Sequence, residues 1–410
     1  MVIVWQTVGY SLTVVASILP VLIETEPRSL RADELTVTEQ SLLVDAADGS
    51  LNDFSLLEGA LIASGVTDLE KVEHYCSEFA NRIEAMATAT SDGSNVITDS
   101  ERIYRFLHSE FLTGKYHSTC TEIDRTLDDG DYNCVTATIL YHCICHVYGL
   151  SPVAVATNTH VRSRLLGDQT FDVETTCREW FDVARRDPRS LAFRSEHQVT
   201  RGLSDVELLA KIYYNRGVSL LETKAFGRAI ALLRISQSLD PADEPTRENI
   251  AAGMNNWALA ESDDGNFERA VELLQDGWKQ YPEFAPFAAN DVHIHQRWGV
   301  ALCEQRRFAE AMQALQAAHV RRPDVALFDR GRLAVFGQWA TWLFESGEFE
   351  NAAQLFEEAG DWFHDVSEIS HYRSIAIQSA VERLAHAGRD DEANRLVDWG
   401  LELDRTHPQH

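Results

Sequence analysis

The sequence has too few basic residues for a typical nucleic-acid-binding protein. It carries 36 lysines and arginines against 64 acidic residues, a formal net charge of −28, and no run of basic residues. Binding to phosphate groups requires clustered positive charge, so the composition argues against nucleic acid as a partner. The overall composition, 45% hydrophobic and 24% charged, is otherwise that of an ordinary globular protein.

No C-x-x-C motif is present, and the cysteines are irregularly spaced. There are seven of them, Cys76, Cys120, Cys134, Cys143, Cys145, Cys177 and Cys303. An odd and irregular set in a long chain does not have the pattern of a disulfide framework. The missing motif also argues against thioredoxin-type redox chemistry and against a zinc ribbon. We therefore expect free cysteines and no cofactor.

Residues 2–23 lack any charged side chain, and their length suits one crossing of a bilayer. No lysine or arginine precedes them and no clear cleavage site follows, so a cleaved signal peptide is disfavoured. We predict that residues 1–30 form a membrane anchor or an uncleaved signal, which would make the protein membrane-associated on an unknown side. The alternatives are a buried hydrophobic segment in a cytoplasmic protein, or a wrongly assigned start codon.

The second half contains a repeat of 41 residues. Five short segments align at that step, and each ends in an alanine, namely Ala229, Ala270, Ala311, Ala352 and Ala393. Small residues recur at the same step, beginning with Gly217, and prolines close the first three units, beginning with Pro241. Paired helices explain this pattern, because small residues let two helices approach closely and a proline stops the second helix.

These positions resemble the tetratricopeptide repeat, a helix-pair repeat whose usual unit has about 34 residues. The resemblance implies an all-α solenoid of about five units over residues 196–410, with a groove that binds a protein or peptide partner. The longer unit predicts longer helices or longer connections. In the last unit Val381 replaces the small residue and Asp390 the aromatic one, as expected of a terminal cap.

In the first half, residues 134–148 have apolar side chains at helical spacing, and Gly149 ends the pattern. Cys134 therefore lies in the first turn of a helix, capped by Asn133 or Asp131. At that position the free backbone N–H groups and the helix dipole favour a thiolate. Cys134 is the candidate nucleophile.

The segment HCICH, residues 142–146, raises the alternative of a metal site. His142 and His146 are four residues apart on one helix face, which can suit zinc. Cys143 and Cys145 diverge around the helix, so a single helix cannot place all four side chains around a tetrahedral ion. We interpret the segment as packing and surface residues and predict no metal site.

Residues 152–157, 159–165 and 169–175 alternate and are rich in valine and threonine, a pattern typical of antiparallel strands. They carry His160 and Asp172. A cysteine at a helix N-terminus followed by these two residues on strands is a Cys–His–Asp arrangement for nucleophilic catalysis. His160 would deprotonate the thiol, and Asp172 would orient the imidazole.

The run GDYNCVTATILYHCICHVYGLSPVAVA and the later THVRSRLLGDQTFDVETT resemble the transglutaminase-like superfamily, whose core is papain-like. The resemblance covers about residues 100–180 and implies an α+β domain over residues 31–195. It also implies that Cys134 is the nucleophile, His160 the base and Asp172 the orienting acid. The residues that follow the histidine and the aspartate depart from the family's commonest pattern, which bears on the substrate class.

The strand register decides which acid faces His160. A two-residue turn at Gly167-Asp168 puts Asp172 on the opposite face of the hairpin from His160. A three-residue turn restores the same face and brings Glu174 opposite His160, where it is a rival orienting acid.

Two functions follow from the sequence. The first is cysteine-dependent acyl transfer or amide hydrolysis on a protein or peptide recruited by the repeats. The second is a non-catalytic adaptor, with a degenerate core and a partner-binding repeat groove.

Overall fold

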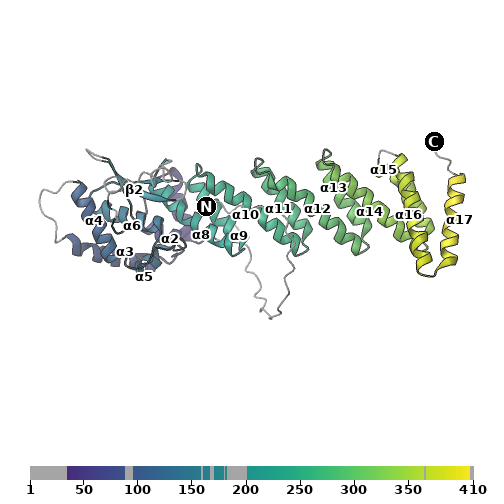
Figure 1. Ribbon diagram of the computed structural model, residues 1–410. Coiled ribbons are helices and arrows are strands. Elements are labelled where there is room, and N and C mark those ends of the chain that lie inside the picture. Colours follow the sequence, from purple (N-terminus) through teal and green to yellow (C-terminus); the bar gives the residue numbers. More distant parts are fainter. Residues whose placement is uncertain are drawn as a thin grey trace. The chain divides into compact units, whose positions relative to one another are not determined.

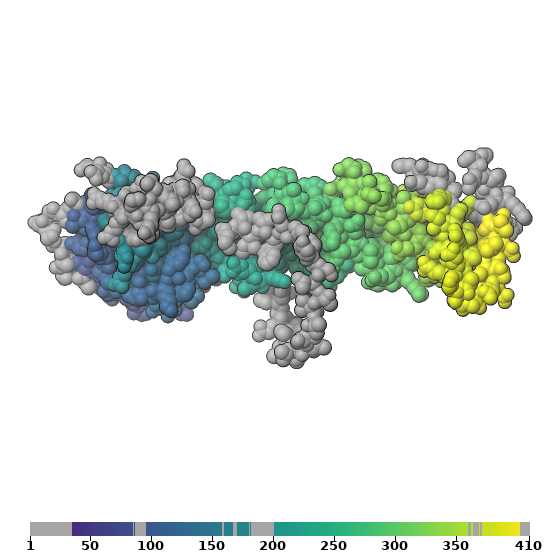
Figure 2. All heavy atoms as spheres, in the orientation of Figure 1, coloured from purple at the N-terminus to yellow at the C-terminus, as the bar shows by residue number. Residues whose placement is uncertain are grey.

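The computed structural model describes residues 35–87, 96–157, 160–166, 170–179, 181, 201–363 and 366–406 (Figure 1), which Figure 2 colours by their position in the sequence. The chain divides into two compact units, Met1–Met254 and Asn255–His410. Residues 2–23 lie outside the described part. Within the described part, none of the helices has both the length and the apolar character that a membrane crossing requires. Membrane association through residues 2–23 therefore stays a prediction.

In the first unit, helices precede a small sheet. They are α1 (Val37–Asp45), the short 3₁₀ helix η2 (Ala46–Asp48), α2 (Leu56–Ala63), α3 (Leu69–Ala87), α4 (Val96–Glu110), α5 (Ile123–Asp129) and α6 (Cys134–Val147). The strands are β1 (Val153–Ala156), β2 (Val161–Leu165), β3 (Phe171–Val173) and β4 (Arg201–Leu203). They form an antiparallel sheet in the order β3-β2-β1-β4.

Helix α6 is the centre of the first unit. Every residue from Val135 to Cys145 is buried, which matches the near-absence of charge in this stretch. The helix packs against β2, α2, α4 and α8 (Asp205–Glu222). A helix that is apolar on all sides has to be surrounded in this way. Its N-terminus is thereby held at a fixed place beside the sheet.

The sequence did not predict β4, the strand at one edge of the sheet. Strand β4 follows the sequence-based boundary at residue 195 and pairs with β1. Helix α8 comes next and, with α9 (Phe226–Leu239), makes the first helix pair. Because α8 also packs on α2 and α6, this pair belongs to the first unit. A strand of three residues is too short to show an alternation of apolar and polar side chains.

The remaining helices are α10 (Glu244–Asp263), α11 (Phe267–Gln280), α12 (Pro286–Glu304), α13 (Phe308–Arg321), α14 (Ala326–Glu345), α15 (Phe349–Trp362), α16 (Val366–His386) and α17 (Asp390–Thr406). The division between the units falls inside α10. Each described pair is a longer helix followed by a shorter one.

The repeat prediction is confirmed. The five alanines stand at the same place, the fourth residue of α9, α11, α13, α15 and α17, and all are buried. The first helices have 18 to 21 residues, and the second helices of four pairs have 14, so the longer unit is taken up mainly in the first helices. At Gly217 a Cβ atom would lie 2.7 Å from Leu233, so this position requires the close helix approach that a glycine allows.

The described chain is therefore mostly helical and built from helix pairs, with one four-stranded sheet. The finer assignment of the first unit to a transglutaminase-like α+β domain stays a prediction.

Candidate active site

The first turn of α6 is fixed by a capping box. The Oδ1 atom of Asn133 accepts hydrogen bonds from the N–H groups of Val135 (2.8 Å) and Thr136 (2.9 Å). In return, the backbone N–H of Asn133 donates to Oγ1 of Thr136 at 3.0 Å. Such a cap satisfies N–H groups that have no partner within the helix. It also sets the place of Cys134, the first residue of α6.

His160 lies between Cys134 and Glu174. Its Nε2 atom is 2.9 Å from each carboxylate oxygen of Glu174. Its side chain is also hydrogen-bonded to the side chain of Cys134. Because Nε2 faces the carboxylate, Nδ1 is the ring nitrogen left for the sulfur. The order thiol, imidazole, carboxylate is that of a nucleophile activated by an oriented base.

Glu174 is held as a carboxylate by its other contacts. Its side chain is 2% exposed, and its Oε1 atom accepts hydrogen bonds from the backbone N–H (3.1 Å) and the hydroxyl (2.5 Å) of Thr176. Burial acts to raise the pKa of Glu174, but the bonds from His160 and Thr176 lower it below its usual value. The buried carboxylate is thus charged and fully engaged.

The imidazole of His160 is held in its charged form. Its side chain is only 12% exposed, and burial acts to lower its pKa. The hydrogen bonds and charges of Cys134 and Glu174 outweigh burial and raise the pKa of His160 to about 10. The ring at neutral pH is therefore an imidazolium beside the carboxylate of Glu174, a state that can give its proton to a leaving group.

Asp172, which the sequence named as the orienting acid, is bound elsewhere, and this assignment is corrected. Its carboxylate accepts hydrogen bonds from Arg162 Nη2 at 2.7 Å and from Arg164 Nε at 2.6 Å. Burial acts to raise the pKa of Asp172, but the two guanidinium groups lower it below its usual value. The carboxylate that hydrogen-bonds to His160 is that of Glu174.

The strand register contributes to the separation of Asp172 from His160. Arg164 of β2 pairs with Asp172 of β3, which leaves five residues, 166–170, between the strands. The three-residue turn expected from the sequence would pair Arg162 with Asp172, so the observed register is shifted by two residues. An even shift keeps all these side chains on one face of the sheet, and it places Asp172 opposite Arg164, one pair farther from His160 than in the expected register. The predicted turn residues Gly167 and Asp168 lie outside the described part.

The HCICH segment does not converge on one point. Nε2 of His142 is 2.9 Å from the hydroxyl oxygen of Ser163, and burial lowers the pKa of His142 to about 3. Cys143 and Cys145 are buried in the core, and burial raises the pKa of both thiols. Among the described residues, no group of three or more histidine, cysteine or acidic side chains is arranged to hold a metal ion.

Tyr116 is a neighbour of the thiol that sequence reasoning missed. Its hydroxyl is hydrogen-bonded to the side chain of Cys134. Burial, with the negative charges of Cys134 and Glu174, raises the pKa of Tyr116 to about 12, so the hydroxyl keeps its proton. No spacing rule connects Tyr116 with the helix that begins 18 residues later, so the sequence offered no signal for it.

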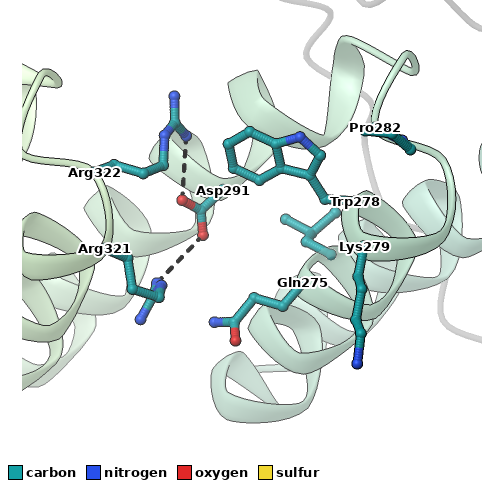
Figure 3. A pocket seen from close by; sticks show the side chains of 8 residues that line it. Gln275, Trp278, Lys279, Pro282, Asp291, Arg321 and Arg322 are labelled. Atoms are coloured by element: carbon teal, nitrogen blue, oxygen red, sulfur yellow. Dashed lines mark hydrogen bonds and ion pairs between the residues drawn. The ribbon is translucent and has the colours of Figure 1, made fainter.

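The second unit has candidate surfaces of its own. A cavity of about 410 Å³ is lined by Leu274, Gln275, Trp278, Lys279, Pro282, Asp291, Arg321 and Arg322 (Figure 3). Asp291 is 3% exposed and lies 3.3 Å from Arg322 Nη1 and 3.6 Å from Arg321 Nη2. The guanidinium of Arg322 stands 4.9 Å from the centre of the Trp278 ring. The lining of this cavity has three basic residues and one acidic residue, although the chain as a whole is acidic.

A larger groove of about 550 Å³ runs along the first helices of successive pairs, α12, α14 and α16. Its walls include Trp342 and Tyr372, and Arg383 Nε lies 3.1 Å from Glu345 Oε1 at one side. The sequence predicted a partner-binding groove in the repeats but named no residues for it.

No family model matches the chain, and no curated protein matches it. Among solved structures, it is similar to menin, described with its binding site for Mixed Lineage Leukemia protein, at 12% identity, a TM-score of 0.36, and coverage of 78% of this chain and 76% of that one. It is also similar to the tetratricopeptide-repeat protein YrrB, described with an unusual peptide-binding site (14% identity, TM-score 0.19, coverage 48% and 88%). A third is PilF of Pseudomonas aeruginosa (16% identity, TM-score 0.18, coverage 49% and 93%). The helical-repeat description of this chain rests on its own helix pairs.

Proposed function

We propose that the protein binds a peptide or protein through its helical repeats and carries out cysteine-dependent acyl transfer or amide hydrolysis on it. The observation that supports the chemistry is the position of His160, hydrogen-bonded to Cys134 on one side and to Glu174 on the other. Cys134 is the first residue of α6, His160 directly precedes β2, and Glu174 directly follows β3.

In the proposed reaction the sulfur of Cys134 attacks an amide carbonyl carbon, and the carbonyl electron pair moves to oxygen. Collapse of this intermediate breaks the C–N bond, and the imidazolium of His160 gives its proton to the departing amine. The resulting thioester is attacked by water or by a second amine, which yields its proton to His160 as the sulfur leaves. Glu174 holds the imidazole in position throughout and takes no proton itself.

The second candidate is an adaptor whose thiol centre is inert. The comparisons agree with this reading better than with catalysis, because the similar structures include tetratricopeptide-repeat proteins, one described with a peptide-binding site. The groove along α12, α14 and α16 supports partner binding under both readings, since aromatic side chains and a charged pair line its walls. The two candidates differ only in what Cys134 does.

Two measurements on the full chain separate them. The first is the rate at which iodoacetamide labels each of the seven cysteines at neutral pH, followed by peptide mass mapping. The second is the burst of p-nitrophenolate when the protein meets p-nitrophenyl acetate. Catalysis predicts that Cys134 is labelled fastest, and that Cys134→Ala and His160→Ala both abolish the burst, because the two groups act as a unit.

Cys303→Ala is the matched control. Cys303 is a free, partly buried cysteine like Cys134, but it lies in the second unit and burial raises its pKa. Its removal is expected to leave the burst intact. Equal labelling of Cys134 and Cys303, together with a burst that survives Cys134→Ala, would leave the adaptor as the function.

A further inference from the structure

Attack on a carbonyl places negative charge on its oxygen, and a thiol enzyme needs hydrogen-bond donors aimed at that oxygen. One donor is available at the start of α6. The capping oxygen of Asn133 is used by the N–H groups of Val135 and Thr136, and the N–H of Cys134 has no acceptor among the described residues. An oxyanion hole usually has two donors, so a second donor is expected beside the sulfur of Cys134.

Tyr116 is held at that place by backbone hydrogen bonds. The N–H of His117 donates to the carbonyl oxygen of Tyr132 at 2.9 Å, and the N–H of Tyr132 donates to that of Lys115 at 3.1 Å. The rings of Tyr116 and Tyr132 meet edge to face, with centroids 6.0 Å apart. This short parallel bridge ties the segment carrying Tyr116 to the residues directly before the α6 cap.

The two sides of Tyr116 have different surroundings. Its hydroxyl reaches the sulfur of Cys134, while the residue as a whole remains 47% exposed. A substrate that approaches Cys134 from solvent would therefore meet the tyrosine as it meets the thiol. The hydroxyl is therefore beside the sulfur, to which the carbonyl carbon of a substrate would bond.

We propose that Tyr116 is a catalytic residue that donates its hydroxyl hydrogen bond to the oxyanion, together with the N–H of Cys134. This inference rests on the proposed function. Before the reaction the hydroxyl donates to the sulfur. When the S–C bond forms and the carbonyl electron pair moves to oxygen, the sulfur loses its negative charge and the hydroxyl turns to the oxyanion. Tyr116 keeps its proton throughout, which agrees with the raised pKa of its hydroxyl.

The test compares two reactions of the same thiol in the full chain. Acylation of Cys134 by p-nitrophenyl acetate passes through an oxyanion, whereas alkylation by iodoacetamide does not. Tyr116→Phe removes the donor and keeps the ring. It is expected to slow acylation by about 100-fold, the usual cost of losing one oxyanion donor, while alkylation keeps its rate or becomes faster. Tyr148→Phe is the control, because that hydroxyl donates to Ile83 at the opposite end of α6.

Acylation that does not slow in Tyr116→Phe overturns the inference. So does a parallel loss of acylation and alkylation, because Tyr116 would then act on the thiol or on the fold. Wild-type protein that p-nitrophenyl acetate does not acylate at Cys134 rejects the proposed function itself. Acylated wild type with an equally fast Tyr116→Phe variant rejects only the role of Tyr116.

Discussion

Both carboxylate oxygens of Glu174 lie 2.9 Å from Nε2 of His160. Asp172, two residues earlier on the same face, is bound by Arg162 and Arg164 instead. Two acids of similar chemistry thus have different partners, and a pair of substitutions can separate their roles.

Glu174→Gln is expected to reduce the rate of ester or amide cleavage by up to about 10⁴-fold, because an amide cannot hold the imidazolium as a carboxylate does. Asp172→Asn is expected to keep the rate but to lower the free energy of unfolding by about 1–3 kcal/mol, since it weakens hydrogen bonds to two charged groups. Steady-state kinetics and urea unfolding of both variants measure the two effects. The reverse pattern would restore Asp172 as the orienting acid.

The charged state of His160 makes stability depend on pH. Against burial, Cys134 and Glu174 raise its pKa from 6.5 to about 10 in the folded protein. A raised pKa stabilises the fold fully below the unfolded value and progressively less as pH increases to the folded value. The wild type should therefore lose stability relative to His160→Gln between about pH 6.5 and 10. Urea unfolding at several pH values measures this, and a constant difference between the two proteins would contradict it.

The repeat packing predicts a strong contrast between two alanines of α13. Ala311 is fully buried, so Ala311→Leu should overpack the helix pair and lower the free energy of unfolding by about 1–3 kcal/mol. Ala317 is exposed on the same helix, so Ala317→Leu should have little effect. Thermal or urea unfolding compares them. Equal melting of the two variants would be incompatible with the described packing of α13.

The cationic pocket depends on one buried acid. Asp291 pairs with Arg321, Arg322 and His295, and although burial acts to raise its pKa, these partners lower it. Asp291→Asn should lower the free energy of unfolding by about 1–3 kcal/mol, because the partly exposed guanidinium groups of Arg321 and Arg322 lose their counter-charge. Asp276→Asn, on the exposed side of α11, is the control. A variant at Asp291 that is as stable as this control would show that the ion pairs contribute little.

Local patterns in the sequence predicted the elements that depend on nearby residues. The helix predicted over residues 134–148 is α6, Cys134–Val147, because apolar spacing and an asparagine cap act within one segment. The helix pairs followed from a repeat that every unit carries. In both cases the information lies within a few turns of chain.

Contacts between distant segments could not be predicted in the same way. The position of Asp172 depends on the length of the β2–β3 connection, which places it opposite Arg164 instead of Arg162. The place of Tyr116 depends on a backbone bridge to Tyr132, which no side-chain pattern reveals. Strand β4 is recruited by its pairing with β1 and has too few residues to show a period.

The two arginines of β2 have a consequence for how this site could change in evolution. A carboxylate already neutralised by two guanidinium groups is a poor acceptor for a third cation. Arg162 and Arg164 therefore keep Asp172 from acting as a partner of an imidazolium. Loss of both arginines would free a second acid on the face that carries His160. Arg162 and Arg164 thus influence which carboxylate is available to His160, and they do so by binding Asp172.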